Sequence, residues 1–87
     1  MNVWRIEFSQ DARKFLHKLR DERLKQRIGI AIDRLAIQPS PPTCKALAGM
    51  DSTYRIRVSD YRIIYKIQDQ RLVVLVIQIG HRREVYR

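Results

Sequence analysis

The spacing of the apolar residues changes at a segment that carries three prolines. From residue 12 to residue 35 the apolar residues recur three and four positions apart, as on one face of a helix, and from residue 54 onward they recur at every second position, as in a strand. Proline ends helical structure because it lacks an amide N–H and pushes the preceding residue out of the helical region. Pro39, Pro41 and Pro42 therefore predict a surface connection between a helical part and a part made of strands.

Two helices are predicted before the prolines. The first begins after Ser9, whose hydroxyl suits an N-cap, and the junction at residues 20–22 is short enough to fold the two helices into an antiparallel pair. The two apolar faces consist of Ala12, Phe15, Leu16 and Leu19, and of Leu24, Ile28, Ala31, Ile32 and Leu35.

Strands are predicted on both sides of the helices. Residues 3–8 alternate between apolar and charged side chains, which indicates a half-buried first strand. Three further strands are expected at residues 54–58, 61–67 and 72–79. The resulting order of strand, helix, helix, strand, strand, strand predicts an α+β fold, with the helix pair packed on one face of a mainly antiparallel sheet.

The charge of the chain points to a polyanionic partner. Its 87 residues suit one small domain, which we expect to span residues 1–87, and 18 Lys and Arg against 9 Asp and Glu give a net charge of +9. A positive field of this size concentrates phosphate backbones at the surface, which makes nucleic acid the first candidate. The alternative is a basic surface that is merely solvated.

Other partners and cofactors are not indicated. Cys44 is the one cysteine, which excludes an internal disulfide and a sulfur-based zinc site, and we expect neither a cofactor nor a metal. The longest apolar run, residues 72–77, is too short to cross a membrane, and the charged Arg5 and Glu7 do not fit a signal peptide. We therefore expect a cytoplasmic protein without a membrane partner.

The first predicted hairpin collects basic side chains on one face of the sheet. A two-residue turn at Ser59 and Asp60 places Arg57 opposite Arg62 and turns Arg55 to the same face. Like charges that face each other on a ladder are destabilising, so packing alone does not explain this pair. The pair is suited to holding an anion.

A second hairpin is expected to bring the end of the chain to the same place. A two-residue turn at Asp69 and Gln70 sets Ile77 beside Arg62, and Gly80 lets the chain bend there. The bend delivers His81, Arg82 and Arg83 to the end of the sheet that holds the arginines. This register is an assumption, because a bulge would turn the following residues to the other face.

Such a cluster suits cleavage of the RNA backbone without a metal. Guanidinium groups stabilise the charge that builds on a phosphate under attack by the 2′-hydroxyl, but they do not accept a proton. His81 is the candidate general acid or base, with Tyr86 as the second, and which proton each handles stays open. Further basic residues could position a large nucleic acid, or could simply be solvated: Arg13, Lys14, Lys18, Arg23, Lys25, Arg27, Lys45 and Arg83.

Three motifs resemble the RelE toxins of the RelE/ParE superfamily. They are Leu-Ala-Gly-Met at residues 47–50, Tyr-Arg-Ile-Arg-Val-Ser-Asp-Tyr-Arg-Ile-Ile-Tyr at residues 54–65, and Ile-Gly-His-Arg-Arg-Glu-Val-Tyr at residues 79–86. The pattern of elements before residue 39 agrees with that family as well. The resemblance implies a RelE-like β-α-α-β-β-β domain and an endoribonuclease of a type II toxin-antitoxin system that enters the ribosomal A site and cuts mRNA there without a metal.

The resemblance also implies the site residues. The functional positions of the family fall on Arg55, Arg57, Arg62, Arg82 and Tyr86. Some members carry lysine where this chain has Arg55, Arg57 and His81. Since an arginine does not lose its proton, this departure puts the identity of the general base in doubt and draws attention to His81.

Partners follow from the same resemblance. It implies a RelB-like antitoxin whose acidic segment covers the basic face, binding to the A site of the small ribosomal subunit and to mRNA, and a toxin-antitoxin complex that binds its own promoter DNA through the antitoxin. Two alternatives remain: a ParE-like toxin that inhibits DNA gyrase through protein contacts, and a non-catalytic RNA-binding module.

Overall fold

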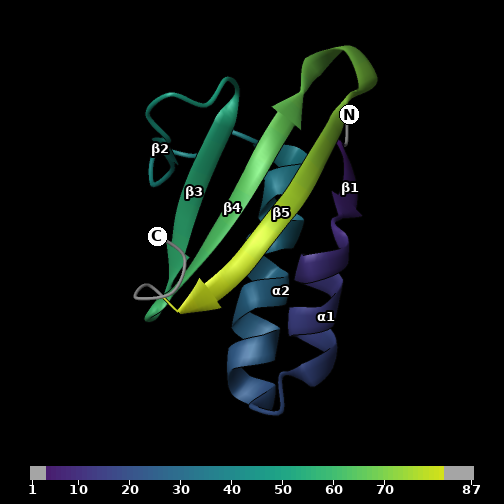
Figure 1. The fold of residues 1–87 in the computed structure, drawn as a ribbon, viewed down its shortest axis with the longest axis vertical. Helices are drawn as coiled ribbons and strands as arrows, with labels where there is room; N and C mark the ends of the chain where they lie inside the picture. The colour runs from purple at the N-terminus through teal and green to yellow at the C-terminus, as the bar shows by residue number, and fades with distance from the viewer. Residues whose placement is uncertain (1–3, 82–87) are drawn as a thin grey trace.

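The computed structural model describes residues 4–81, which form two helices and a five-stranded sheet (Figure 1). The helices are α1 (Gln10–Lys18) and α2 (Glu22–Ile37). The strands are β1 (Arg5–Phe8), β2 (Lys45–Ala46), β3 (Thr53–Val58), β4 (Tyr61–Gln68) and β5 (Val73–His81), and a short 3₁₀ helix, η1 (Asp69–Arg71), joins the last two. No helix within this described part is long and apolar enough to span a bilayer.

The strands lie in the order β1-β5-β4-β3-β2. Three of the four pairings are antiparallel, and β1 pairs with β5 in parallel. Both helices lie against one face of this sheet (Figure 1). The predicted α+β layout is confirmed, whereas the two-residue strand β2 was not expected.

Side-chain caps fix where each helix begins. The Ser9 hydroxyl accepts a hydrogen bond from the Ala12 N–H (3.1 Å), which confirms the expected N-cap of α1, and Asp21 Oδ1 accepts one from the Leu24 N–H (3.1 Å) at the start of α2. Ser9 also holds α1 to β5, because its hydroxyl donates to the Ile77 carbonyl and its N–H donates to the Val76 carbonyl (2.8 Å).

Tyr65 lies at the centre of the core between the sheet and the helices. The residue is fully buried, and its hydroxyl donates a hydrogen bond of 2.7 Å to the Pro39 carbonyl. This bond ties the proline-rich connection to β4. Burial raises the pKa of the Tyr65 phenol far above its ordinary value, and the neighbouring Cys44 adds to the rise. The residues buried around it include Ala12, Ile28, Leu35, Ile56, Ile63, Val74 and Val76.

The connection between β4 and β5 differs from the expected two-residue turn at Asp69 and Gln70. Gln68 pairs with Val73, so four residues join the strands: those of η1 and then Leu72, whose φ of 53° lies in the left-handed region. A two-residue turn of the favoured type needs residues such as Asn and Gly that adopt positive φ readily, and Asp69-Gln70 does not supply them. The last strand consequently begins at Val73, one residue later than predicted.

A β-bulge then shifts the register within the same hairpin. Tyr65 pairs with Val76 and Ile64 pairs with Gln78, so Ile77 is an extra residue in β5. The expected pairing of Ile77 with Arg62 is therefore wrong, and Gly80 occupies that position. Gly80 also lies inside β5 and does not mark a bend away from the sheet.

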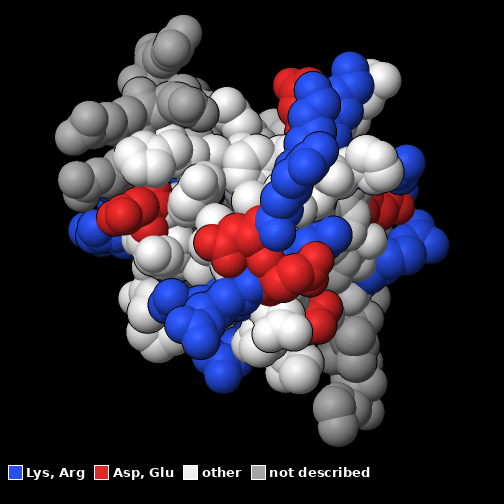
Figure 2. All heavy atoms as spheres, turned by 90° about the horizontal axis from the view of Figure 1, so that it is seen from below, with Lys and Arg blue, Asp and Glu red and all other residues white. Residues whose placement is uncertain are grey.

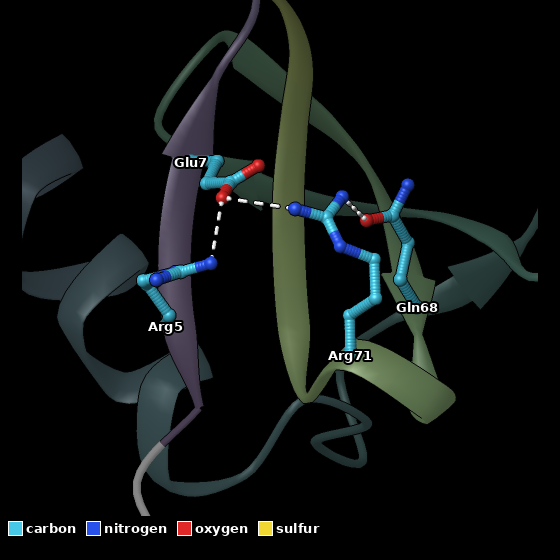
Figure 3. A network of polar contacts seen from close by, with 4 residues as sticks. All are labelled: Arg5, Glu7, Gln68 and Arg71. Carbon is cyan, nitrogen blue, oxygen red and sulfur yellow. Dashed lines mark hydrogen bonds and ion pairs between the residues drawn. The ribbon is translucent and has the colours of Figure 1, made fainter.

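A polar network covers the sheet at the edge formed by β1 (Figure 3). Glu7 Oε2 contacts the guanidinium groups of Arg5 (3.3 Å) and Arg71 (3.4 Å), and Arg71 donates a further hydrogen bond to Gln68 Oε1 (2.9 Å). Residues of β1, η1 and β4 are thereby linked across the start of β5, where Val73 is fully buried.

Candidate functional site

The β3–β4 hairpin places its basic residues as the sequence predicts. Val58 pairs with Tyr61 across the turn at Ser59 and Asp60, and Arg57 lies directly opposite Arg62. Ser59 adopts a φ of 56°, which lets the chain reverse in two residues. The predicted register of this hairpin is confirmed.

The basic side chains lie on the face of the sheet that is turned away from the helices. Tyr54, Ile56 and Val58 belong to the core or pack against it, and alternate residues of a strand point to opposite faces. Pairing extends the basic face across the strands, because Lys45 on β2 is opposite Arg55. The outer face carries Lys45, Arg55, Arg57, Arg62 and Lys66, and these five residues are called the basic face below.

The arginines of the basic face differ in how firmly they are held. Arg57 is exposed, and its Nε donates to the Ser59 carbonyl (3.4 Å), which keeps the side chain close to the turn. Arg62 is half-buried in the middle of the sheet, with Nε and Nη1 shielded from solvent. A half-buried guanidinium beside an exposed one forms a positive site that suits a phosphate.

His81 reaches the expected end of the sheet but lies on its other face. It pairs with Tyr61, whose ring it meets edge to face with the centroids 5.6 Å apart, whereas Arg62 pairs with Gly80. His81 therefore reaches the end of the sheet that holds the arginines, as expected, but it does not share their face. The cause is the bulge at Ile77, which turns the residues after it to the opposite side.

The remaining predicted residues divide into three groups. Arg82, Arg83 and Tyr86 lie outside the described residues. Two basic residues of α2, Arg23 and Arg27, line a cavity together with His81. The other predicted helical residues are exposed along α1 and α2: Arg13, Lys14, Lys18 and Lys25.

Acidic residues interrupt the basic surface at this end of the molecule. Figure 2 shows the end formed by the turn between the helices, where basic side chains surround a smaller acidic group. Asp21 and Asp60 are two acidic residues of the cavity that holds His81. The sequence reasoning missed this cavity, because its position depends on the register of β4 and β5. Among residues 4–81, no group of three or more His, Cys, Asp or Glu side chains could hold a metal ion.

Comparisons with known proteins agree on one family. Residues 6–86 match the family model described as the ParE toxin of the parDE type II toxin-antitoxin system. The chain is 32% identical over 85 residues to Toxin RelG of Mycobacterium tuberculosis, covering 94% of each chain. It is also 32% identical over 88 residues to the mRNA interferase toxin RelE of Escherichia coli, covering 93% of this chain and 87% of the relative.

Solved structures share the fold over nearly the whole chain. The isolated RelE toxin of E. coli superposes with a TM-score of 0.81 at 28% identity, covering 97% of this chain and 92% of that one. The toxin in the intact E. coli RelBE toxin-antitoxin complex gives a TM-score of 0.80 at 26% identity, covering 91% and 96%.

Proposed function

We propose that this chain stops translation by cutting mRNA in the ribosomal A site. The premise is that the chain belongs to the RelE/ParE superfamily and is a RelE-type toxin of a type II toxin-antitoxin system. The observation that carries this proposal is the basic face, where Arg57 and Arg62 stand directly opposite each other with Arg55 beside them. A relative of similar length, RelE of E. coli, is named an mRNA interferase.

The proposed reaction requires no group beyond RNA and side chains. The ribose 2′-oxygen loses its proton and bonds to the adjacent phosphorus, while the bond from phosphorus to the 5′-oxygen of the next nucleotide breaks and that oxygen takes up a proton. The products are a 2′,3′-cyclic phosphate and a 5′-hydroxyl end. Arg55, Arg57 and Arg62 would bind the phosphate and stabilise the charge that builds on its non-bridging oxygens. Arg82 is proposed to act with them.

Tyr86 and His81 are the two candidates for proton transfer. His81 and Arg62 lie on opposite faces of the sheet. RNA held by the arginines would therefore have to continue around the end of the sheet to contact His81. Tyr86 is therefore the first candidate. We expect Tyr86→Phe to lower the rate of the chemical step, and His81→Gln to weaken RNA binding more than it lowers that rate.

An antitoxin is the proposed protein partner. The similar E. coli structure is that of a RelBE toxin-antitoxin complex, and an acidic antitoxin segment would complement the basic face. Beside that face, a groove of about 540 Å³ between α2, the proline-rich connection and β3 is lined by Leu35, Ile37 and Arg57, which suits an amphipathic segment. We further propose that the complex binds its promoter DNA through the antitoxin.

One observation favours a second function. The family model that matches the chain is described as the ParE toxin, so inhibition of DNA gyrase is the competing proposal. A dense phosphate-binding face is not needed for a protein contact with gyrase, and it favours the nuclease.

Two assays separate these functions. Purified toxin is added to a translating extract, where mRNA integrity is followed, and to gyrase with relaxed plasmid, where supercoiling is followed. The nuclease account expects cut mRNA and unaffected gyrase. The reverse result would establish gyrase inhibition, and intact mRNA together with unaffected gyrase would leave an RNA-binding module.

A further inference from the structure

A cavity of about 320 Å³ lies between the turn that joins the helices and the turn that joins β3 to β4. Its walls come from the start of α2, from residues 59–61 and from the end of β5. The cavity is on the helix side of the sheet, whereas the basic face is on the other side. Its volume is within the range of small-molecule sites, whose lower bound is about 300 Å³.

Aromatic rings form one wall of this cavity. Tyr61 and His81 both line it, and their rings meet edge to face at a centroid distance of 5.6 Å with 80° between the planes. Phe15 of α1 packs against Tyr61 from the core side, with centroids 5.8 Å apart. Two contacts therefore hold the Tyr61 ring, and His81 is half-buried beside it. Aromatic rings held in this way are platforms on which unpaired nucleobases stack.

The charged residues of the cavity have both signs. Arg23 and Arg27 are four residues apart on α2, so their side chains lie on the same side of the helix. Asp60 lies at the other turn, and Asp21 is already engaged in capping α2. A phosphate suits the arginines, and the Asp60 carboxylate, which only accepts hydrogen bonds, suits an amino group. A nucleotide whose base carries an amino group satisfies both requirements.

Consecutive residues of β4 connect the cavity to the basic face. Tyr61 in the cavity and Arg62 on the basic face are consecutive residues that point to opposite sides of β4. An RNA strand that crosses the end of the sheet beside the turn at Ser59 and Asp60 would therefore touch both. This continuity favours RNA as the source of the nucleotide.

We propose that this cavity binds one unpaired nucleotide of RNA, with its phosphate on Arg23 and Arg27, its base against His81 and Tyr61, and an amino group of the base donating to Asp60. The proposal rests on the proposed function in that RNA is the substrate. It predicts a preference for adenine, cytosine or guanine over uracil, because uracil has no amino group and presents carbonyl oxygens to the carboxylate.

The test measures binding separately from cleavage. Fluorescence anisotropy gives the affinity of labelled oligoadenylate, oligocytidylate and oligouridylate for toxin that carries Arg62→Ala. We expect the first two to bind about tenfold more tightly than oligouridylate, in line with the contribution of one hydrogen bond to a charged group. On that background, Asp60→Asn should remove most of this preference, because an amide both donates and accepts, and Arg27→Gln should weaken all three.

Arg34→Gln is the matched control, because it removes the same charge from an exposed position of the same helix outside the cavity. It should leave the affinity for all three oligonucleotides nearly unchanged, whereas Arg27→Gln lowers it. NMR signals of the His81 ring should shift on addition of oligoadenylate, which reports binding even for a variant with altered stability. Equal affinity for the three oligonucleotides, or an unmoved His81 signal, would overturn the inference.

The two proposals fail in different ways. If wild-type toxin cuts mRNA on ribosomes but shows no base preference and no His81 shift, the cavity proposal is wrong and the proposed function stands. If the preference and the shift appear but mRNA stays intact in a translating extract, the cavity binds RNA and the proposed nuclease function is wrong.

Discussion

Arg57 and Arg62 are direct partners in the β3–β4 ladder, so two positively charged side chains lie side by side on the basic face. Removing the exposed member should relieve this repulsion. We expect Arg57→Gln to raise the free energy of unfolding by about 0.5 kcal/mol at low salt while it lowers mRNA cleavage. Urea unfolding of both proteins checks the first part. Lys66→Gln is the control, because Lys66 is opposite Thr53 and should gain less; an equal gain would contradict the assignment to the arginine pair.

Leu72 adopts a left-handed conformation at the end of the β4–β5 connection, and about half of the residue is exposed. A side chain with a Cβ is strained there, and glycine is not. Leu72→Gly should therefore increase stability relative to Leu72→Ala by about 1 kcal/mol, measured by urea unfolding. Alanine is the appropriate reference because it keeps the Cβ and loses the same exposed side chain. A glycine variant no more stable than the alanine variant would refute the strain.

The buried Tyr65 hydroxyl donates to the Pro39 carbonyl, and Tyr65→Phe removes this bond while keeping the ring. We expect a loss of about 1 kcal/mol near neutral pH, because the Pro39 carbonyl loses its donor. Thermal or urea unfolding measures the loss. An unchanged stability would show that the bond does not hold the proline-rich connection.

The same residue predicts a pH dependence at the alkaline end. Since burial raises the pKa of Tyr65, its phenol stays protonated in the folded protein and ionises in the unfolded chain above about pH 10. The stability that this phenol contributes is complete below that pH and falls as the pH rises further. Unfolding measured from neutral to strongly alkaline pH should therefore fall less steeply for Tyr65→Phe than for wild type. Parallel curves would contradict the raised pKa.

Glu7 holds two arginines at the β1 edge of the sheet (Figure 3). Glu7→Gln keeps the shape of the side chain but removes the negative charge that lies between the guanidinium groups of Arg5 and Arg71. Because the network is partly exposed, we expect a loss of only about 0.5 kcal/mol at low salt, which shrinks as sodium chloride is added. The exposed Asp33→Asn serves as control for loss of one acidic charge. A loss that does not depend on salt would argue against an electrostatic origin.

The sequence predicted those parts of the fold that depend on local rules. The turn at Ser59 and Asp60 set the register of β3 and β4 because it has two residues, and Ser9 marked the start of α1. The register of β4 and β5 could not be predicted from the sequence, because the left-handed Leu72 and the extra Ile77 leave no clear signal in it. The parallel pairing of β1 with β5 also joins segments at opposite ends of the chain.

The candidate site, like the fold, was predicted only where it depends on local rules. The arginines of the basic face depend on one hairpin and were placed correctly on the outer side of the sheet. His81 depended on the second hairpin, and the bulge moved it to the other face, where it meets Tyr61. The cavity at that end combines residues from α2, the β3–β4 turn and β5, and no single stretch of sequence indicates it.

The basic face is proposed to cut mRNA on the ribosome. The most direct measurement adds wild-type toxin or Arg62→Ala to a translating extract and to naked mRNA, and maps new RNA ends by primer extension. We predict ends inside the A-site codon of stalled ribosomes for wild type, none for a correctly folded Arg62→Ala, and none on naked mRNA. Intact mRNA on ribosomes treated with wild-type toxin that still binds its antitoxin would contradict the account.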